Sequence, residues 1–134
     1  MKLSKFLMLI FLSTLLTSCY EDINLKDYID RNSPLTLEVN EKDKVMGLQI
    51  PSISSMAPES EKFEKFIQWS NANIKGWQST PASYSADLIV RQGDFHLLHT
   101  IGSIGVVVGF KDKYGKEKQY TKTIKKGDLD FLLK

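Results

Sequence analysis

The sequence predicts an α+β fold, in which a mostly antiparallel β-sheet carries one main amphipathic helix packed on one face. Three observations predict it. Several segments between residues 35 and 124 alternate apolar and polar residues with a period of two, as half-buried strands do. One segment, about residues 59–75, repeats with the period of a helix. Turn-forming residues separate these segments.

The first two strands form a predicted hairpin. Residues 35–40 alternate, the polar cluster 40–43 indicates a turn, and residues 46–50 alternate again. Pro51 is expected to end the second strand, because it lacks the N–H that a strand ladder uses. Residues 52–58 are expected to form a loop. The apolar positions are Leu35, Leu37 and Val39, followed by Met46, Leu48 and Ile50.

The predicted helix has a defined start and end. Pro58 suits a first helical turn, and the acidic residues Glu59 and Glu61 complement the helix dipole there. Gly76 is typical of a position just past a helix C-terminus. One face of the helix is apolar and is expected to pack on the sheet. Its members are Phe63, Phe66, Ile67, Ser70 and Ile74.

The rest of the chain predicts more strands and one short helix. Asp128 is expected to cap that last helix, which ends at Leu133. The further strands are expected over residues 84–91, 95–101, 104–110 and 117–124.

The first residues of the chain have the composition of an export signal. Lys2 and Lys5 give a positive start, and the uncharged, mainly apolar run 6–16 follows. That run is shorter than the roughly 20 residues that a membrane-spanning helix needs. We therefore expect a cleaved signal and not a permanent membrane helix.

The signal ends in Leu16-Thr17-Ser18-Cys19, an aliphatic residue and two small residues before a cysteine. This motif resembles the lipobox of bacterial lipoprotein precursors, and the resemblance covers residues 1–19 only. It implies that Cys19 becomes the first residue of the mature protein and carries lipid, with palmitate among its acyl chains. Cys19 is also the only cysteine, so no internal disulfide can form.

The expected organisation follows from this N-terminus. Residues 1–18 form the cleaved signal, and residues 35–134 form a single α+β domain. Between them, residues 19–34 form a polar, lipidated tether, in which Tyr28 and Ile29 are able to dock on the domain. Tyr20, and not Asp, follows the lipidated residue. Similarity to the sorting rule of enteric bacteria therefore favours the outer membrane, facing the periplasm. The inner membrane and the cell surface remain open alternatives.

The charge balance argues against nucleic acid as a partner. The full chain carries 18 basic and 16 acidic residues, a formal charge of +2. Removing the signal also removes Lys2 and Lys5, and it leaves equal numbers of basic and acidic residues. Nucleic-acid binding draws much of its affinity from neutralising phosphates. We therefore expect the membrane, through the lipid on Cys19, and a protein as partners.

No group of residues predicts catalysis. His96 and His99 lie three apart on a predicted strand, so their side chains are expected to point to opposite faces and not to share a metal. Ser103 lacks the surrounding G-x-S-x-G motif of a nucleophile elbow. Gly102 and Gly105 fit neither phosphate-binding glycine motif. The sequence therefore predicts no enzyme, no cofactor and no metal site.

Two segments have residues typical of binding surfaces. Segment 76–84 carries Trp77 and Tyr84 near its ends, and both residue types are favoured interface anchors. The alternative is that Trp77 packs over the core. The hairpin 111–118 is basic and suits an acidic partner or anionic head groups, whereas the alternative is a solubilising sheet edge. Its lysines are Lys111, Lys113, Lys116 and Lys118.

These observations favour a membrane-anchored, non-catalytic protein-binding module of the cell envelope. Within this class, the small size and the location suit an immunity or inhibitor protein that neutralises an envelope-targeting toxin or hydrolase. Two alternatives remain open. One is a structural or assembly lipoprotein of an envelope complex, and the other is a small-molecule or glycan-binding module that uses Trp77 and Tyr84.

Replacing the lipidated residue tests the assignment of the N-terminus. Cys19→Ser is expected to abolish incorporation of labelled palmitate, because the hydroxyl does not replace the thiol in lipidation. The protein is then left unanchored or unprocessed. The measurement is palmitate labelling of cells followed by fractionation, and labelling of the variant at the parent level would contradict the lipobox.

Overall fold

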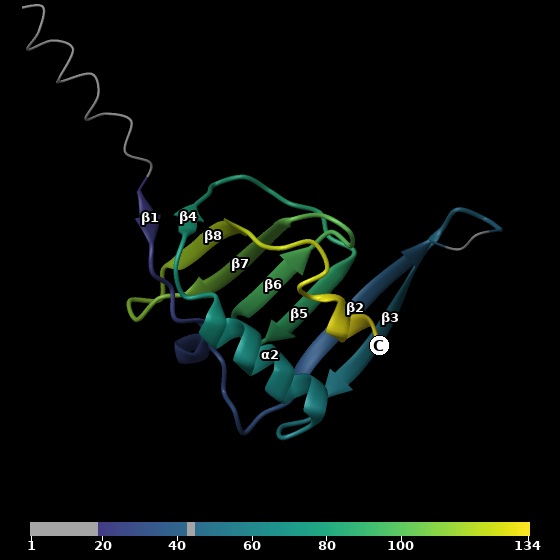
Figure 1. The fold of residues 1–134 in the computed structure, drawn as a ribbon, viewed down its shortest axis with the longest axis horizontal. Helices are drawn as coiled ribbons and strands as arrows, with labels where there is room; N and C mark the ends of the chain where they lie inside the picture. Colours follow the sequence, from purple (N-terminus) through teal and green to yellow (C-terminus); the bar gives the residue numbers. More distant parts are fainter. Residues whose placement is uncertain (1–18, 43–44) are drawn as a thin grey trace, which may run out of the picture.

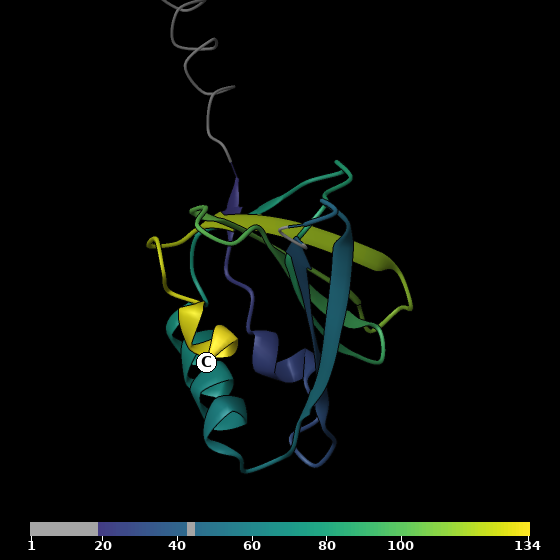
Figure 2. The same ribbon diagram turned by 90° about the vertical axis from the view of Figure 1, so that its right-hand side faces the viewer.

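The computed structural model describes residues 19–42 and 45–134. The predicted signal, including the first three residues of the lipobox, lies outside the described residues. The described chain forms one eight-stranded sheet in which every neighbouring pair is antiparallel. The helix α2 packs on one face of this sheet (Figures 1 and 2). The predicted α+β fold is therefore confirmed.

The strands lie in a simple order across the sheet. From one edge to the other they are β1 (Tyr20–Glu21), β4 (Trp77–Ser79), β8 (Glu117–Thr123), β7 (Gly105–Lys111), β6 (Phe95–His99), β5 (Leu88–Gln92), β2 (Leu35–Lys42) and β3 (Gln49–Met56). The helices are η2 (Leu25–Tyr28), α2 (Glu61–Ala72) and η3 (Asp130–Leu133).

Helix α2 is shorter than the predicted segment 59–75 at both ends. Its N-cap is Ser60, whose hydroxyl accepts a hydrogen bond from the N–H of Phe63 at 3.3 Å. Glu59 lies outside the helix with a positive φ of 65°. The helix ends at the cap residue Asn73, before the predicted stop at Gly76.

The core lies between α2 and the sheet face that points toward it. Phe63 and Phe66 of the helix are fully buried there, as the periodicity predicts. Ser70 is also buried, and its hydroxyl donates to the carbonyl of Phe66 at 2.9 Å, which satisfies this buried hydroxyl. The sheet contributes a row of inward residues that lie opposite one another on five neighbouring strands. They are Leu37, Val90, Leu97, Val108 and Tyr120.

The second strand of the first hairpin differs from the prediction. The sequence analysis ends this strand at Pro51, but β3 continues to Met56. The reason is that Pro51 lies on an edge strand, opposite Asn40. The N–H of Asn40 donates to Asp87 on the other side at 2.7 Å, so this pair exchanges no hydrogen bond. A proline that faces solvent at an edge costs the sheet no bond.

The segment predicted as a tether, residues 19–34, packs on the domain. Its strand β1 pairs with β4, and the N–H of Ile23 donates to Ile74 at 2.8 Å. Leu25 is fully buried and Ile29 is nearly so, because both contribute to the main core. Cys19 therefore lies directly before the first strand of the sheet.

The packing of this segment can be tested with one buried and one exposed position. Leu25→Ala is expected to lower the free energy of unfolding by about 2–5 kcal/mol, because it leaves a cavity in the core. Tyr20→Ala, at a side chain that is 66% exposed, is expected to change it far less. Urea unfolding of both variants measures the difference. Equal, small effects would mean that residues 19–34 are a free tether.

Candidate functional site

Trp77, nominated above as a partner-binding residue, is part of the core. Its side chain is fully buried, and its indole N–H donates to the carbonyl of Asn73 at 2.6 Å. The ammonium group of Lys122 lies over its ring, 6.0 Å from the centroid. Trp77 is thus unavailable to a partner, and the alternative in which it packs over the core is the correct one.

Tyr84 lies outside, on the loop that connects β4 to β5. Its side chain is 41% exposed, and its hydroxyl shares a hydrogen bond of 2.7 Å with that of Thr80. The loop is held on the sheet by Gln119, whose amide donates to the carbonyls of Ala82 at 2.6 Å and Thr80 at 3.3 Å. The structure therefore separates Trp77 and Tyr84, because one points into the core and the other lies on the opposite side of the sheet.

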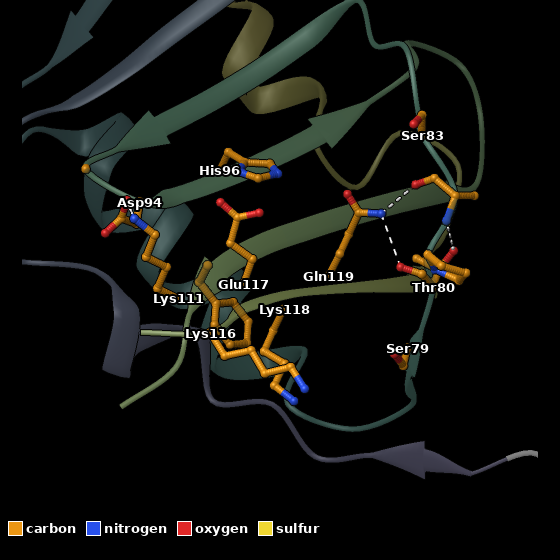
Figure 3. Close-up of a pocket in the computed structure, with 14 residues that line it drawn as sticks. Ser79, Thr80, Ser83, Asp94, His96, Lys111, Lys116, Glu117, Lys118 and Gln119 are labelled. Atoms are coloured by element: carbon orange, nitrogen blue, oxygen red, sulfur yellow. Dashed lines mark hydrogen bonds and ion pairs between the residues drawn. The ribbon is translucent and has the colours of Figure 1, made fainter. Parts of the chain in front are cut away.

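The sheet face away from α2 carries a groove of about 810 Å³ (Figure 3). The loop 79–83 forms one wall, and the turn at Gly93 and Asp94 forms part of the other. His96 of β6 and Glu117 of β8 point toward one another between these walls. The groove offers hydrogen-bond donors and acceptors. Among the described residues, His96 forms no hydrogen bond to a serine or threonine hydroxyl of the kind that a nucleophile would need.

Three of the four lysines nominated above surround this groove, namely Lys111, Lys116 and Lys118. Lys111 is paired with Asp94 at 3.1 Å, and this exposed ion pair lies at the rim. Lys113 is elsewhere, over the ring of Tyr114 at 5.0 Å from the centroid. The basic hairpin is therefore divided between the groove and the turn of the hairpin.

His96 lies against the backbone of Gly109 on the neighbouring strand. A Cβ at Gly109 would lie 2.3 Å from Cε1 and Nε2 of the imidazole, so the ring would have to move if another residue replaced this glycine. Burial lowers the pKa of His96, the charge of Arg91 lowers it further, and Glu117 acts in the opposite direction. The neutral imidazole is the form that this site favours.

His99 points to the other face, as the spacing predicts. It is 3% exposed, and its Nδ1 lies 2.8 Å from the carbonyl oxygen of Gly105. The two histidines therefore cannot share a ligand. Within residues 19–42 and 45–134, no three His, Cys, Asp or Glu side chains lie close enough together to hold a metal ion.

The sequence analysis predicts the hairpin of β2 and β3 but not its exposed apolar surface. It extends beyond the rest of the sheet, on the right of Figure 1. The pairing of β2 with β5 ends at Val39, whereas its pairing with β3 continues to Lys42. Several apolar residues past that point are more than half exposed. They are Val45, Met46, Leu48 and Ile50, with exposed fractions of 90%, 72%, 60% and 56%.

A signal for this exposure was present in the sequence. Charged residues cluster at 41–44, directly beside the apolar run, and such a cluster is typical of a solvated hairpin tip. The sequence predicts a strand over residues 46–50, but β3 begins at Gln49, so Met46 and Leu48 lie outside the strand. Alternation also does not show whether another layer covers such residues.

The two edges of the sheet are far apart. β1, which follows Cys19 directly, forms one edge, and β3 forms the other. Eight strands at the usual spacing of about 4.8 Å place these edges about 34 Å apart along the sheet.

No family model, curated protein or solved structure matches this chain. None of the helices in the described part is long and apolar enough to cross a membrane.

The contact between Gly109 and His96 can be tested by a double-mutant cycle. Gly109→Ala is expected to destabilise the domain by about 1–3 kcal/mol, because the new methyl group overlaps the imidazole. In a His96→Ala background the same substitution is expected to cost much less, since the overlapping ring is gone. Urea unfolding of the four proteins measures the coupling. Additive costs would show that the ring does not depend on this glycine.

Proposed function

We propose that this chain is a lipid-anchored, non-catalytic protein-binding module of the bacterial cell envelope, with Cys19 as the lipidated residue. Within that class, we propose an inhibitor or immunity protein that blocks a toxin or hydrolase directed at the envelope. The proposed location is the outer membrane, facing the periplasm. The partners are then the membrane and one protein, without nucleic acid, cofactor or metal.

The observation that carries this proposal is the projecting hairpin with its exposed apolar tip. Met46 and Leu48 are more than half exposed, and they lie beyond the part of the sheet that packs on the core. Contiguous exposed apolar side chains on a soluble domain mark interaction surfaces. A narrow arm of this kind suits insertion into the concave site of an enzyme, where a few apolar anchors carry most of the binding energy.

The position of the hairpin supports the same function. It belongs to the sheet edge opposite to β1, the strand that follows the anchored residue. The anchor therefore restrains one edge, and the other edge is about 34 Å away along the sheet. A partner that arrives from the aqueous side meets the hairpin tip without competing with the lipid for the same surface.

The groove around His96 favours a second candidate, a module that binds a small polar ligand. Its lining combines the imidazole, the carboxylate of Glu117 and the hydroxyls of Ser79, Thr80 and Ser83. Trp77 and its aromatic face take no part in it, because that side chain is buried. The experiment below includes a groove variant for this reason.

The proposal is tested by photo-crosslinking from the hairpin in intact cells. A photoreactive amino acid at Leu48 is expected to give one stoichiometric adduct with a second protein. The same amino acid at Tyr114, which is 82% exposed on the β7–β8 turn, is the matched control and is expected to give none. An inhibitor predicts that the captured protein is an envelope-acting enzyme whose activity falls on 1:1 addition of this chain.

Variants of the lipoprotein then measure which surface binds. Leu48→Asp is expected to raise the Kd for the captured protein at least about tenfold, since it places a charge in an apolar contact. Glu117→Gln, in the groove, is expected to leave the Kd unchanged. Unchanged binding by Leu48→Asp would contradict the proposal, and loss with Glu117→Gln alone would favour the groove. Capture of a resident envelope complex would instead indicate an assembly lipoprotein.

A further inference from the structure

The two edges of the sheet are protected very differently. The β1 edge has only two residues, and so short an edge offers little to another strand. The β3 edge has eight residues, and all of them except Met56 are exposed. Natural edge strands are usually blunted by charged side chains, but Gln49–Met56 contains none. Pro51 is its one protective residue of the usual kind.

The hydrogen bonds of β2 define which backbone groups of β3 face outward. Asn40 directs its N–H to Asp87, away from β3, so its partner Pro51 also faces away from β2. Every second residue of a strand directs its backbone N–H and C=O groups to the same side. Gln49, Ile53 and Ser55 therefore present both groups outward, and Pro51 presents its C=O outward. These groups form an open ladder that another strand can extend.

We propose that β3 pairs antiparallel with β3 of a second copy of this chain, about a two-fold axis at Ser52. In this register Gln49 lies opposite Ser55 of the second copy, and Pro51 lies opposite Ile53. Each outward N–H then meets a carbonyl: Gln49 donates to Ser55, Ser55 to Gln49, and Ile53 to Pro51. If the axis moves to Pro51, the N–H of Ser55 has no acceptor in the second strand. If it moves to Ile53, the N–H of Gln49 has none.

The side chains match in the same register. On the face away from α2, Ile53 lies beside the second copy's Pro51, so two apolar groups meet where each copy alone exposes 67% of Ile53. On the other face the two Ser52 hydroxyls lie opposite one another, and such hydroxyl pairs stabilise antiparallel strands. No like charges face each other across the axis, because the strand carries no charge.

A second copy fits this edge better than an unrelated strand for two reasons. When β3 pairs with β3 of a second copy, every outward N–H of the strand has an acceptor and the facing side chains match. In addition, chains confined to one membrane surface by their lipids meet at a raised effective concentration. Met46 and Leu48 lie outside the paired segment, so the dimer leaves the hairpin tip to the partner proposed above. The raised effective concentration depends on the proposed lipid anchor, whereas the register does not.

The register is tested with single cysteines in the intact lipoprotein. The two Ser52 residues form a pair without hydrogen bonds between them, with Cα atoms about 4.5 Å apart, a separation that a disulfide spans. Under mild oxidation of isolated membranes, Ser52→Cys is expected to form a disulfide-linked dimer. Ser54→Cys is the matched control, because its two copies lie about 13 Å apart along the strands. The parent chain, with only Cys19, is the blank.

A second variant tests whether the pairing depends on this edge. Ile53→Asp, combined with Ser52→Cys, places like charges near the axis and is expected to reduce dimer formation at least tenfold. Tyr114→Asp with Ser52→Cys, charged at a distant exposed site, is expected to dimerise like Ser52→Cys alone. Circular dichroism checks that both variants fold.

Three results would overturn the dimer. The first is a Ser52→Cys protein that stays monomeric, and the second is a Ser54→Cys protein that crosslinks equally well. The third, with a photoreactive amino acid at Ile53, is an adduct whose mass is that of this chain plus a different protein. The last result would assign the β3 edge to another partner. Leu48→Asp separates the two proposals, because it is expected to weaken capture of the partner enzyme and to leave the Ser52→Cys dimer intact.

Discussion

The fold depends on the packing of one helix face against one side of one sheet. Phe63, Phe66 and Ile67 of α2 meet the inward residues of the central strands, and each such buried side chain contributes about 1.5–3 kcal/mol. A chain of this size builds only one core of this kind, so the other sheet face is left to the loop 80–87 and to solvent. The groove around His96 exists because, within the described part of the chain, no second helical layer covers that face.

The same constraint determines what lies at the two ends of the sheet. At one edge β1, η2 and the residues between them close the core, which places Cys19 directly before the first strand. At the other edge the helix does not reach the tip of β2 and β3. Apolar side chains there are exposed because they lie too far from the core to pack against it. Ile50 and Ile53 lie on opposite faces of the edge strand.

Glycine and proline have specific tasks in this arrangement. Gly109 leaves room for the imidazole of His96, which a methyl group would displace. Pro51 lies where its missing N–H faces solvent, so the ladder to β2 remains complete. Both residues stand in strands, where propensity alone disfavours them. Their positions become understandable only when the neighbour across the sheet is known.

The sequence by itself determined the α+β class, the buried face of α2 and the opposite orientation of His96 and His99, because local periodicity defines which side chains share a face. It did not determine that Trp77 is buried, that Pro51 lies inside a strand, or that Leu25 belongs to the core. Those outcomes depend on which segments become neighbours across the sheet. That choice follows from how much apolar area the whole chain can bury at once, a quantity that no local pattern contains.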